Sequence, residues 1–352
     1  MVMAAETAPR KRNRISSWFF NLLGIGIFGL ILYLGGANAW EQMVNSDWGY
    51  AARVLGITIA WNLLAAFRWA SISRWVLGDA GRLPFRYYFT CHMIGMFLGQ
   101  VVPITVGMLG GRPVALSLSQ QVSLRRSALS VLLDKLFDLF LALLVALPAA
   151  LYLVGWLSLT TTLVIMAVAV VAGAIAIGWQ YERALSLVSR AGSRMAQFLV
   201  RVPVGRRLVR RVPEQLERLS EEQVLPNRAA LASFLITVGM YALLSARTYL
   251  ISQTMHLGIP WELLMMGVSI TQLALIFSVT PGSLGFLEGG WAAVLALAGL
   301  SHEQFLAFVI GRRVYVLVAT ALTTLLAFGW IRESPARLFR AVLTTARRPA
   351  AQ

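Results

Sequence analysis

One stretch of the sequence decides the fold: TPGSLGFLEG, from Thr280 to Gly289, inside an otherwise apolar run from Glu262 to Leu300. Pro281 lacks a backbone donor and the glycines loosen the chain, so the stretch breaks the helix that its apolar flanks favour. Lipid cannot satisfy the backbone groups that such a break frees. The break therefore persists at membrane depth only when it is buried in protein or lines a polar cavity. We expect a broken, re-entrant helical hairpin over residues 262–300.

The composition indicates that the chain folds in a membrane. Of its 352 residues, 58% are hydrophobic and 13% are charged, and its mean hydropathy is +0.70. A soluble domain carries about a quarter charged residues, and an apolar run of about 20 residues can cross a bilayer. Such runs are Trp18–Ala39, Ala52–Ala70, Ser127–Val154, Leu157–Trp179, Ala229–Ile251 and Gln304–Ile331. We predict an all-α polytopic membrane protein with about six full spans and two hairpins in one domain, residues 17–331.

The first of these runs also has features of a secretory signal peptide, because basic residues precede it and Ala37-Asn38-Ala39 is similar to a cleavage site. Its length of about 22 residues exceeds the roughly 7–15 of a signal-peptide core. We therefore interpret Trp18–Ala39 as the first span, with the N-terminus in the cytoplasm.

The sequence contains two copies of one pattern, a proline followed by two glycines at intervals of four residues. The copies align when the sequence is shifted against itself so that Pro103 falls on Pro281. The copies are Pro103, Gly107 and Gly111 in the first half, and Pro281, Gly285 and Gly289 in the second. Downstream, Ser123 and Ser301 coincide as candidate helix N-caps. Three predicted spans separate the copies, and an odd number turns the second copy upside down. The pattern indicates an inverted repeat, which recurs in secondary transporters, with its first hairpin over residues 87–118.

The glycines of this pattern have a second interpretation, because small residues four positions apart also allow membrane helices to pack closely. The sequence leaves both interpretations open.

The predicted topology places the basic segments on one side of the membrane. The net charge of +16 arises from 29 arginines and 2 lysines against 15 acidic residues. Counting spans from a cytoplasmic N-terminus places every basic segment on one side: residues 1–16, 74–86, 125–126, an Arg-rich loop 180–228 and the tail 332–352. This bias is typical of cytoplasmic connections, so we expect a multi-pass protein of the cytoplasmic (inner) membrane with both termini cytoplasmic. It also argues against a nucleic-acid partner. The Arg-rich loop is predicted to form short amphipathic helices.

Eight charged residues lie in or beside the predicted membrane segments, where a charge at the helix centre costs roughly 2.5–3.5 kcal/mol. They are Arg112, Asp134, Lys135, Asp138, Arg247, Glu288, Arg312 and Arg313. Such groups must be paired or hydrated. For the cluster from Asp134 to Asp138, two interpretations stay open: a functional group of charges, or structural pairing with Arg247, Arg312 or Arg313.

Arg112 and Glu288 stand beside the glycines of the two breaks, where an open backbone can face a polar cavity. Arginine suits bidentate phosphate recognition, and free helix ends add amide donors for an anion. We expect Arg112 and Arg312 to contact an anion, and Glu288 to balance charge or to titrate as a coupling proton site. The candidate translocation residues are Pro103, Gly107, Gly111, Arg112, Asp134, Lys135, Pro281, Gly285, Glu288, Gly289, Arg312 and Arg313.

Motifs for several chemistries are absent from the sequence. It has no Walker-type phosphate loop and no nucleophile elbow. His92, His256 and His302 lack the spacing of a metal site, and we interpret them as packing or interfacial residues. We therefore expect no cofactor, no metal and no nucleotide hydrolysis, and an enzyme is the less favoured assignment.

Three motifs resemble the transmembrane region of lysylphosphatidylglycerol synthases, a flippase-like domain. They are Gly110-Gly111-Arg112, Ser127-Ala128-Leu129-Ser130 with Asp134-Lys135, and TPGSLGFLEG followed by Arg312. The resemblance covers nearly the whole chain, although Pro103-Ile104-Thr105-Val106-Gly107 departs from the Pro-Gly break of that family. It implies an inverted repeat with two re-entrant hairpins and translocation of a modified anionic phospholipid between leaflets. The chain resembles a free-standing member without a synthetase or glycosyltransferase domain, so lysine transfer is not implied.

The leading hypothesis is a lipid translocator that moves an anionic phospholipid or a polyprenyl-phosphate-type lipid. One alternative is a membrane-embedded glycosyl- or lipid-modifying transferase, for which Glu41 and Asp47, on an external connection, are the nearest candidate carboxylates. Another is a non-transporting accessory subunit whose partner is a lipid-modifying enzyme. The motifs leave open the lipid, the energy source and the oligomeric state.

Overall fold

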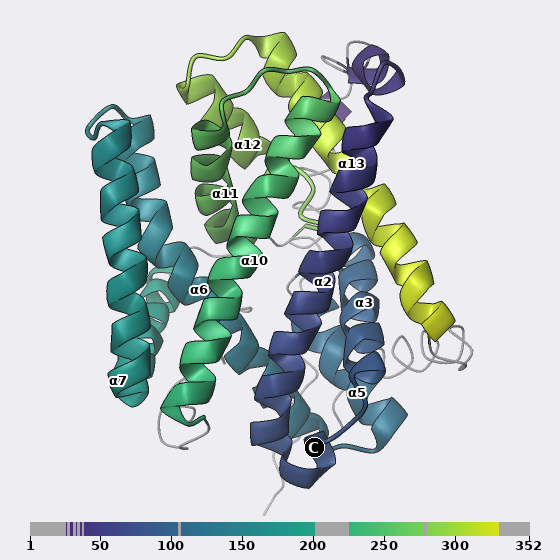
Figure 1. Ribbon diagram of the computed structural model, residues 1–352, viewed down its shortest axis with the longest axis vertical. Coiled ribbons are helices and arrows are strands. Elements are labelled where there is room, and N and C mark those ends of the chain that lie inside the picture. Colours follow the sequence, from purple (N-terminus) through teal and green to yellow (C-terminus); the bar gives the residue numbers. More distant parts are fainter. Residues whose placement is uncertain are drawn as a thin grey trace, which may run out of the picture.

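The structure, a computed structural model, describes residues 39–104, 107–200, 225–276 and 280–330 and a few residues between 26 and 36. In these ranges every regular element is a helix (Figure 1). The first half contains α2 (Trp48–Leu77), the turn η1 (Gly78–Gly81), α3 (Phe85–Val101), the π-helical turn η2 (Gly107–Gly111), α5 (Arg112–Gln120) and α6 (Leu124–Leu153). The remainder contains α7 (Leu159–Val200), α10 (Asn227–Thr254), α11 (Trp261–Ile276), α12 (Phe286–Leu297) and α13 (His302–Trp330).

Five helices are long and apolar enough to cross a membrane: α2, α6, α7 as far as Trp179, α10 and α13. They correspond to the last five predicted spans and confirm the polytopic all-α fold. The first predicted span, Trp18–Ala39, lies almost wholly outside the described residues. Exposed tryptophans mark the ends of the spans, with Trp48 and Trp156 at one end and Trp179 and Trp330 at the other. Such a belt is typical of the two membrane interfaces.

The inverted repeat is visible in Figure 1, where α3 and α5 lie at the lower end of the molecule and α11 and α12 at the upper end. The shift that superimposes Pro103 on Pro281 also places Leu124, the first residue of α6, on His302, the first residue of α13. Each half therefore consists of a span, a broken hairpin and a second span, and the two halves have opposite orientations. The predicted hairpins at 87–118 and 262–300 are confirmed as the pairs α3–α5 and α11–α12.

This topology predicts the sidedness of two exposed serines, Ser123 before α6 and Ser301 before α13. We expect single cysteines, Ser123→Cys or Ser301→Cys in a Cys91→Ala background, to react with a membrane-impermeant maleimide from opposite faces of sealed vesicles. Reaction of both cysteines from the same face would exclude the inverted arrangement.

Two local predictions are wrong in part. Residues 180–200 of the Arg-rich segment continue α7 as one helix instead of forming a separate short one. Strong helix formers fill this part and its first proline is Pro203, so nothing ends the helix earlier; residues 201–224 lie outside the described residues. Ser301 accepts from the Gln304 amide at 3.3 Å and caps α13, whereas Ser123 makes no side-chain cap bond to α6.

Candidate functional site

The two hairpin breaks meet in the structure. Pro103 and Pro281 form an antiparallel backbone bridge, and the Gly282 N–H donates to the Val102 carbonyl at 3.1 Å. Segments from opposite halves of the sequence thus touch at their equivalent prolines, as two copies related by a shared axis require. Because helices end and begin at both breaks, free helix ends converge on this contact.

The repeated glycines differ in what they do. A side chain at Gly107 would lie 2.6 Å from the Cα atom of Gly99, so this glycine lets η2 pack backbone to backbone against α3, and Gly111 also faces α3. Gly285 has a φ of +80° as the N-cap of α12, a conformation that favours glycine. No atom lies within 4 Å of the position that a Cβ would take at Gly289. Close packing therefore explains the first glycine pattern, and backbone conformation explains Gly285.

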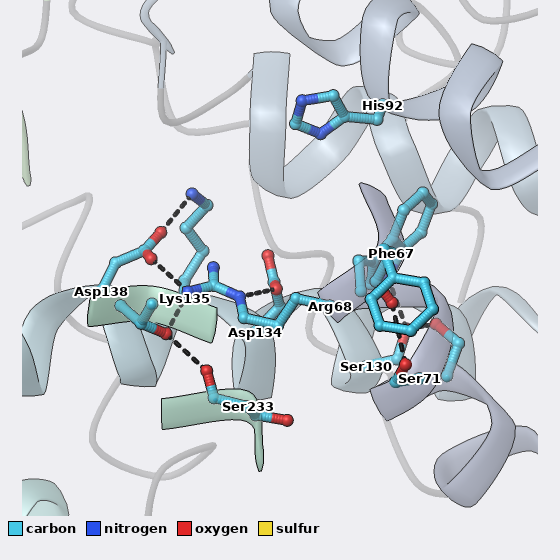
Figure 2. Close-up of polar contacts among 12 residues, drawn as sticks. Phe67, Arg68, Ser71, His92, Ser130, Asp134, Lys135, Asp138 and Ser233 are labelled. Atoms are coloured by element: carbon cyan, nitrogen blue, oxygen red, sulfur yellow. Dashed lines mark hydrogen bonds and ion pairs between the residues drawn. The ribbon is translucent and has the colours of Figure 1, made fainter. Parts of the chain in front are cut away.

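A buried ion-pair network follows the first break (Figure 2). Asp134 on α6 accepts from Arg68 Nε at 2.7 Å, the contact drawn in Figure 2. It also accepts from Arg112 Nη1 at 3.0 Å, and these three side chains are at most 1% exposed. Arg68 Nη1 also donates to Asp138 at 2.6 Å, and Lys135 Nζ donates to the other oxygen of Asp138 at 2.6 Å. The network connects α2, α5 and α6, so the second arm of the first hairpin is fixed to two spans.

The predicted structural pairing of this cluster with Arg247, Arg312 or Arg313 is wrong, because the partners come from the same half of the repeat. Asp134 lies ten residues into α6 and Arg312 ten residues into α13, or about 15 Å from the start of each helix. Since the two helices start at opposite ends of the molecule, these charges lie at different depths (Figure 1).

His92 extends the network to α3. The Asn62 amide nitrogen donates to the Thr58 carbonyl at 2.8 Å, so Asn62 Oδ1 faces His92 Nε2 at 3.0 Å. Nε2 must therefore carry the proton, which leaves Nδ1 to accept from Arg112 Nη2. His92 is thus a buried, hydrogen-bonded core residue, a more specific role than the packing or interfacial position that the sequence predicts.

At the second break, the charged side chains contact backbone groups of the break itself as well as each other. Glu288, in the first turn of α12, accepts from the Gly285 amide at 2.8 Å with one oxygen, and its other oxygen lies 3.4 Å from Arg313 Nη1. Arg313 Nη1 also donates to the Gly282 carbonyl at 2.7 Å. Arg313 therefore connects α13 to the break, and Glu288 lies at the positive end of the α12 dipole.

Arg247 on α10 and Arg312 on α13 have no carboxylate partner among the described residues. The guanidinium of Arg312 lies over the Trp291 ring at 5.4 Å from its centroid, and that of Arg247 over the Trp61 ring at 5.9 Å. Arg247 is 8% exposed, and its Nε is buried without an acceptor. The charge of Arg312 also interacts with that of Arg247. Two like charges in a poorly solvated place are costly unless something compensates them.

The ion pair between hairpin and span has opposite polarity in the two halves of the repeat. Asp134-Lys135 superimpose on Arg312-Arg313 under the shift that aligns the two prolines. In the first half the carboxylate is on the span and its arginine, Arg112, is on the hairpin. In the second half the arginine is on the span and the carboxylate, Glu288, is on the hairpin. Of the predicted site residues, the structure brings Arg112 to Asp134, Glu288 to Arg313, and Pro103 to Pro281.

Arg68 and Asn62 are absent from the predicted site. The available signal for Arg68 was its position as a charge deep in the apolar run Ala52–Ala70. Its partner Asp134 lies 66 residues away, and sequence spacing gives no indication of that contact.

The described residues contain no group of three or more His, Cys, Asp or Glu side chains that could hold a metal ion. Comparison with curated proteins gives no significant match, and comparison with solved structures gives none either. A family model described as the lysylphosphatidylglycerol synthase TM region matches residues 21–342, which include both hairpins and both charge clusters. The chain therefore belongs to the family of the lysylphosphatidylglycerol synthase transmembrane region.

Proposed function

We propose that the protein is a flippase-like transporter that moves a lipid with an anionic head group between the two leaflets of the membrane. The observation that carries the proposal is the contact between two oppositely oriented hairpins at their breaks, with charged side chains beside each break. Secondary transporters bind substrate where broken helices of inverted repeats meet. The family is named for a modified phosphatidylglycerol, which supports a phospholipid as cargo, and a polyprenyl-phosphate-type lipid is the other candidate.

The orientation follows from the sidedness of charge. Arg74 lies in the last turn of α2, Arg82 in the connection and Arg86 in the first turn of α3, and Arg125 and Arg126 begin α6. These helix ends are at the lower end of Figure 1. The acidic residues Asp47, Glu262 and Glu303 lie at the N-terminal ends of α2, α11 and α13, at the upper end of Figure 1. We assign the basic end to the cytoplasm and the protein to the cytoplasmic (inner) membrane.

The transferase alternative gains no support from the geometry. Asp47, one of its two candidate carboxylates, caps α2 by accepting from the amides of Gly49 and Tyr50 at 2.7 and 3.2 Å. A partner enzyme, as the accessory-subunit alternative requires, would be detected by co-purification.

The proposal predicts slower transport by two variants, Glu288→Gln and Arg312→Ala. In proteoliposomes with a fluorescent anionic lipid and a membrane-impermeant quencher, we expect each variant to translocate about tenfold more slowly than wild type. A tenfold change corresponds to about 1.4 kcal/mol, the scale of one hydrogen bond to a charged group.

The matched control is Glu303→Gln, which changes an exposed carboxylate at the start of α13 and should leave the rate unchanged. Variants as fast as wild type would refute the assigned residues. A wild-type protein without translocation would refute the transporter and favour the accessory or transferase alternatives.

A further inference from the structure

We infer that Arg247 and Arg312 form a phosphate-binding subsite for the cargo head group, selective for a dianionic phosphomonoester or diphosphate over a monoanionic phosphodiester. The inference rests on the proposed function, whose cargo it specifies. It adds Arg247, a residue of α10, to the site.

The first observation is charge balance. The first-half network contains Arg68, Arg112 and Lys135 against Asp134 and Asp138, and each of its cations contacts a carboxylate. The second-half cluster contains Arg247, Arg312 and Arg313 against Glu288 alone, and Glu288 contacts Arg313. The second half thus has two positive charges in excess among the described residues, since Glu288 contacts Arg313 and interacts with Arg312 only at longer range. A ligand with two negative charges would balance them.

The second observation is the geometry of the two guanidiniums. Each lies over the face of an indole ring, Arg247 on Trp61 and Arg312 on Trp291. A contact with an indole ring supplies no oxygen acceptor, so the N–H groups of these guanidiniums remain available to donate to a ligand. The planar fork of arginine then matches two phosphate oxygens. The buried Nε of Arg247 has no acceptor, as expected of a donor whose acceptor is a ligand.

The third observation separates this pair from Arg112. Arg112 Nε is also buried without an acceptor, but Asp134 neutralises its charge and its Nη2 donates to His92. An anion at Arg112 would have to displace Asp134. An anion at Arg247 and Arg312 would displace no carboxylate in contact with them among the described residues, so we place the phosphate there.

The subsite also lies between the two halves of the repeat. Trp61 belongs to α2 of the first half, and Arg247, Arg312 and Trp291 belong to the second. α10 packs against both α2 and α13. A phosphate held by these two arginines of the second half would therefore lie at the boundary with the first half, where Trp61 contacts Arg247.

Binding of short-chain lipids to the purified full-length protein tests the inference at pH 8, where a phosphomonoester is close to dianionic. The probes are dioctanoyl phosphatidic acid, a monoester; dioctanoyl phosphatidylglycerol, a diester; dioctanoyl phosphatidylcholine, a zwitterion; and inorganic phosphate. We expect phosphatidic acid to bind wild type about tenfold more tightly than phosphatidylglycerol. Arg247→Gln and Arg312→Gln should each weaken its binding about tenfold, the effect of one lost charge-assisted contact.

The matched control is Arg53→Gln. Arg53 is an exposed arginine that stacks on Tyr50 at 5.0 Å, so the change removes the same charge and stacking outside the subsite and should leave binding unaltered. Equal affinity for phosphatidic acid and phosphatidylglycerol would overturn the dianion assignment. Unchanged binding by the Arg247 variant would overturn the subsite. Competition by inorganic phosphate at the concentrations at which phosphatidic acid binds would show a site for free phosphate instead of a lipid head group.

A stability measurement distinguishes a variant that has lost a ligand contact from one that binds poorly because it is misfolded. Removing a buried charge that has no partner should stabilise the ligand-free protein, so we expect Arg247→Met to raise its Tm by ~2 °C or more while abolishing binding. A lower Tm for Arg247→Met would show that Arg247 is structural and would overturn the subsite. Wild type that binds phosphatidic acid but moves no lipid would refute the proposed function alone, and translocation unaffected by Arg247→Gln would refute this inference alone.

Discussion

Replacement of Asp134 by Asn is expected to destabilise the protein by about 3–5 kcal/mol, the usual cost of removing one partner from a buried ion pair. The Asp134 carboxylate accepts from Arg68 and Arg112 at 2.7 and 3.0 Å, and neither arginine is more than 1% exposed. An amide of the same shape keeps the volume but loses the charge and replaces one acceptor by a donor. Arg112 would then have no carboxylate among the described residues, and Arg68 would retain Asp138 alone.

Unfolding of the purified protein by increasing SDS in mixed micelles would measure this change. Asp79→Asn is the control, since Asp79 pairs with Arg82 at 3.4 Å on the exposed surface and such pairs contribute little. An Asp134→Asn variant as stable as wild type would show that the network contributes no net stability, and that Asp134 is retained for another purpose.

Gly107→Ala is expected to have the second largest effect, a loss of about 2–3 kcal/mol from overpacking. The added methyl group would lie 2.6 Å from Gly99 Cα and 2.9 Å from the Gly95 carbonyl oxygen, both of them backbone atoms of α3 that cannot rotate away. The first arm of the hairpin would have to separate from the turn η2, which also moves Arg112 away from Asp134.

Gly110→Ala is the matched control, because Gly110 is in the same π-helical turn and no atom lies within 4 Å of its Cβ position. The thermal midpoint of each variant in detergent would separate the two, with a lower value for Gly107→Ala and no decrease for Gly110→Ala. Equal midpoints would contradict close backbone packing at Gly107.

The hairpins and the repeat could be predicted from the sequence because proline and glycine act on the chain locally. Pro103 and Pro281 remove hydrogen bonds wherever the chain goes, and the constant spacing between the two copies of the pattern is visible without any coordinates. Hydropathy predicted six spans in the same way, and the five that fall within the described residues are membrane-length helices. The extension of α7 was missed because the apolar run stops around Trp179, at the expected membrane interface, whereas residues that favour helix continue beyond it.

The pairing of charges could not be predicted, because it depends on which helix faces are in contact. Three arginines of the other half, Arg247, Arg312 and Arg313, were possible partners for the acidic pair Asp134 and Asp138. The arginines that contact the pair are instead Arg68 and Arg112. Both belong to elements that pack directly on α6. Nor could the sequence separate Arg312, stacked on an indole, from Arg313, which donates to the Gly282 carbonyl, since the two are adjacent.

The contact between the two breaks has a mechanical consequence. Pro103 and Pro281 lack amide hydrogens, so their pairing cannot be extended into a ladder, and the bond from Gly282 to Val102 is the backbone hydrogen bond that joins them. One such bond contributes about 1 kcal/mol, less than twice the thermal energy, so this hydrogen bond by itself holds the two breaks together only weakly. Each hairpin is meanwhile held within its own half, by the packing of Gly107 and by the Arg313 bond of 2.7 Å to Gly282. Because α3 also packs on α13 of the other half, this bond at the pseudosymmetry axis is one part of a larger interface between the two halves.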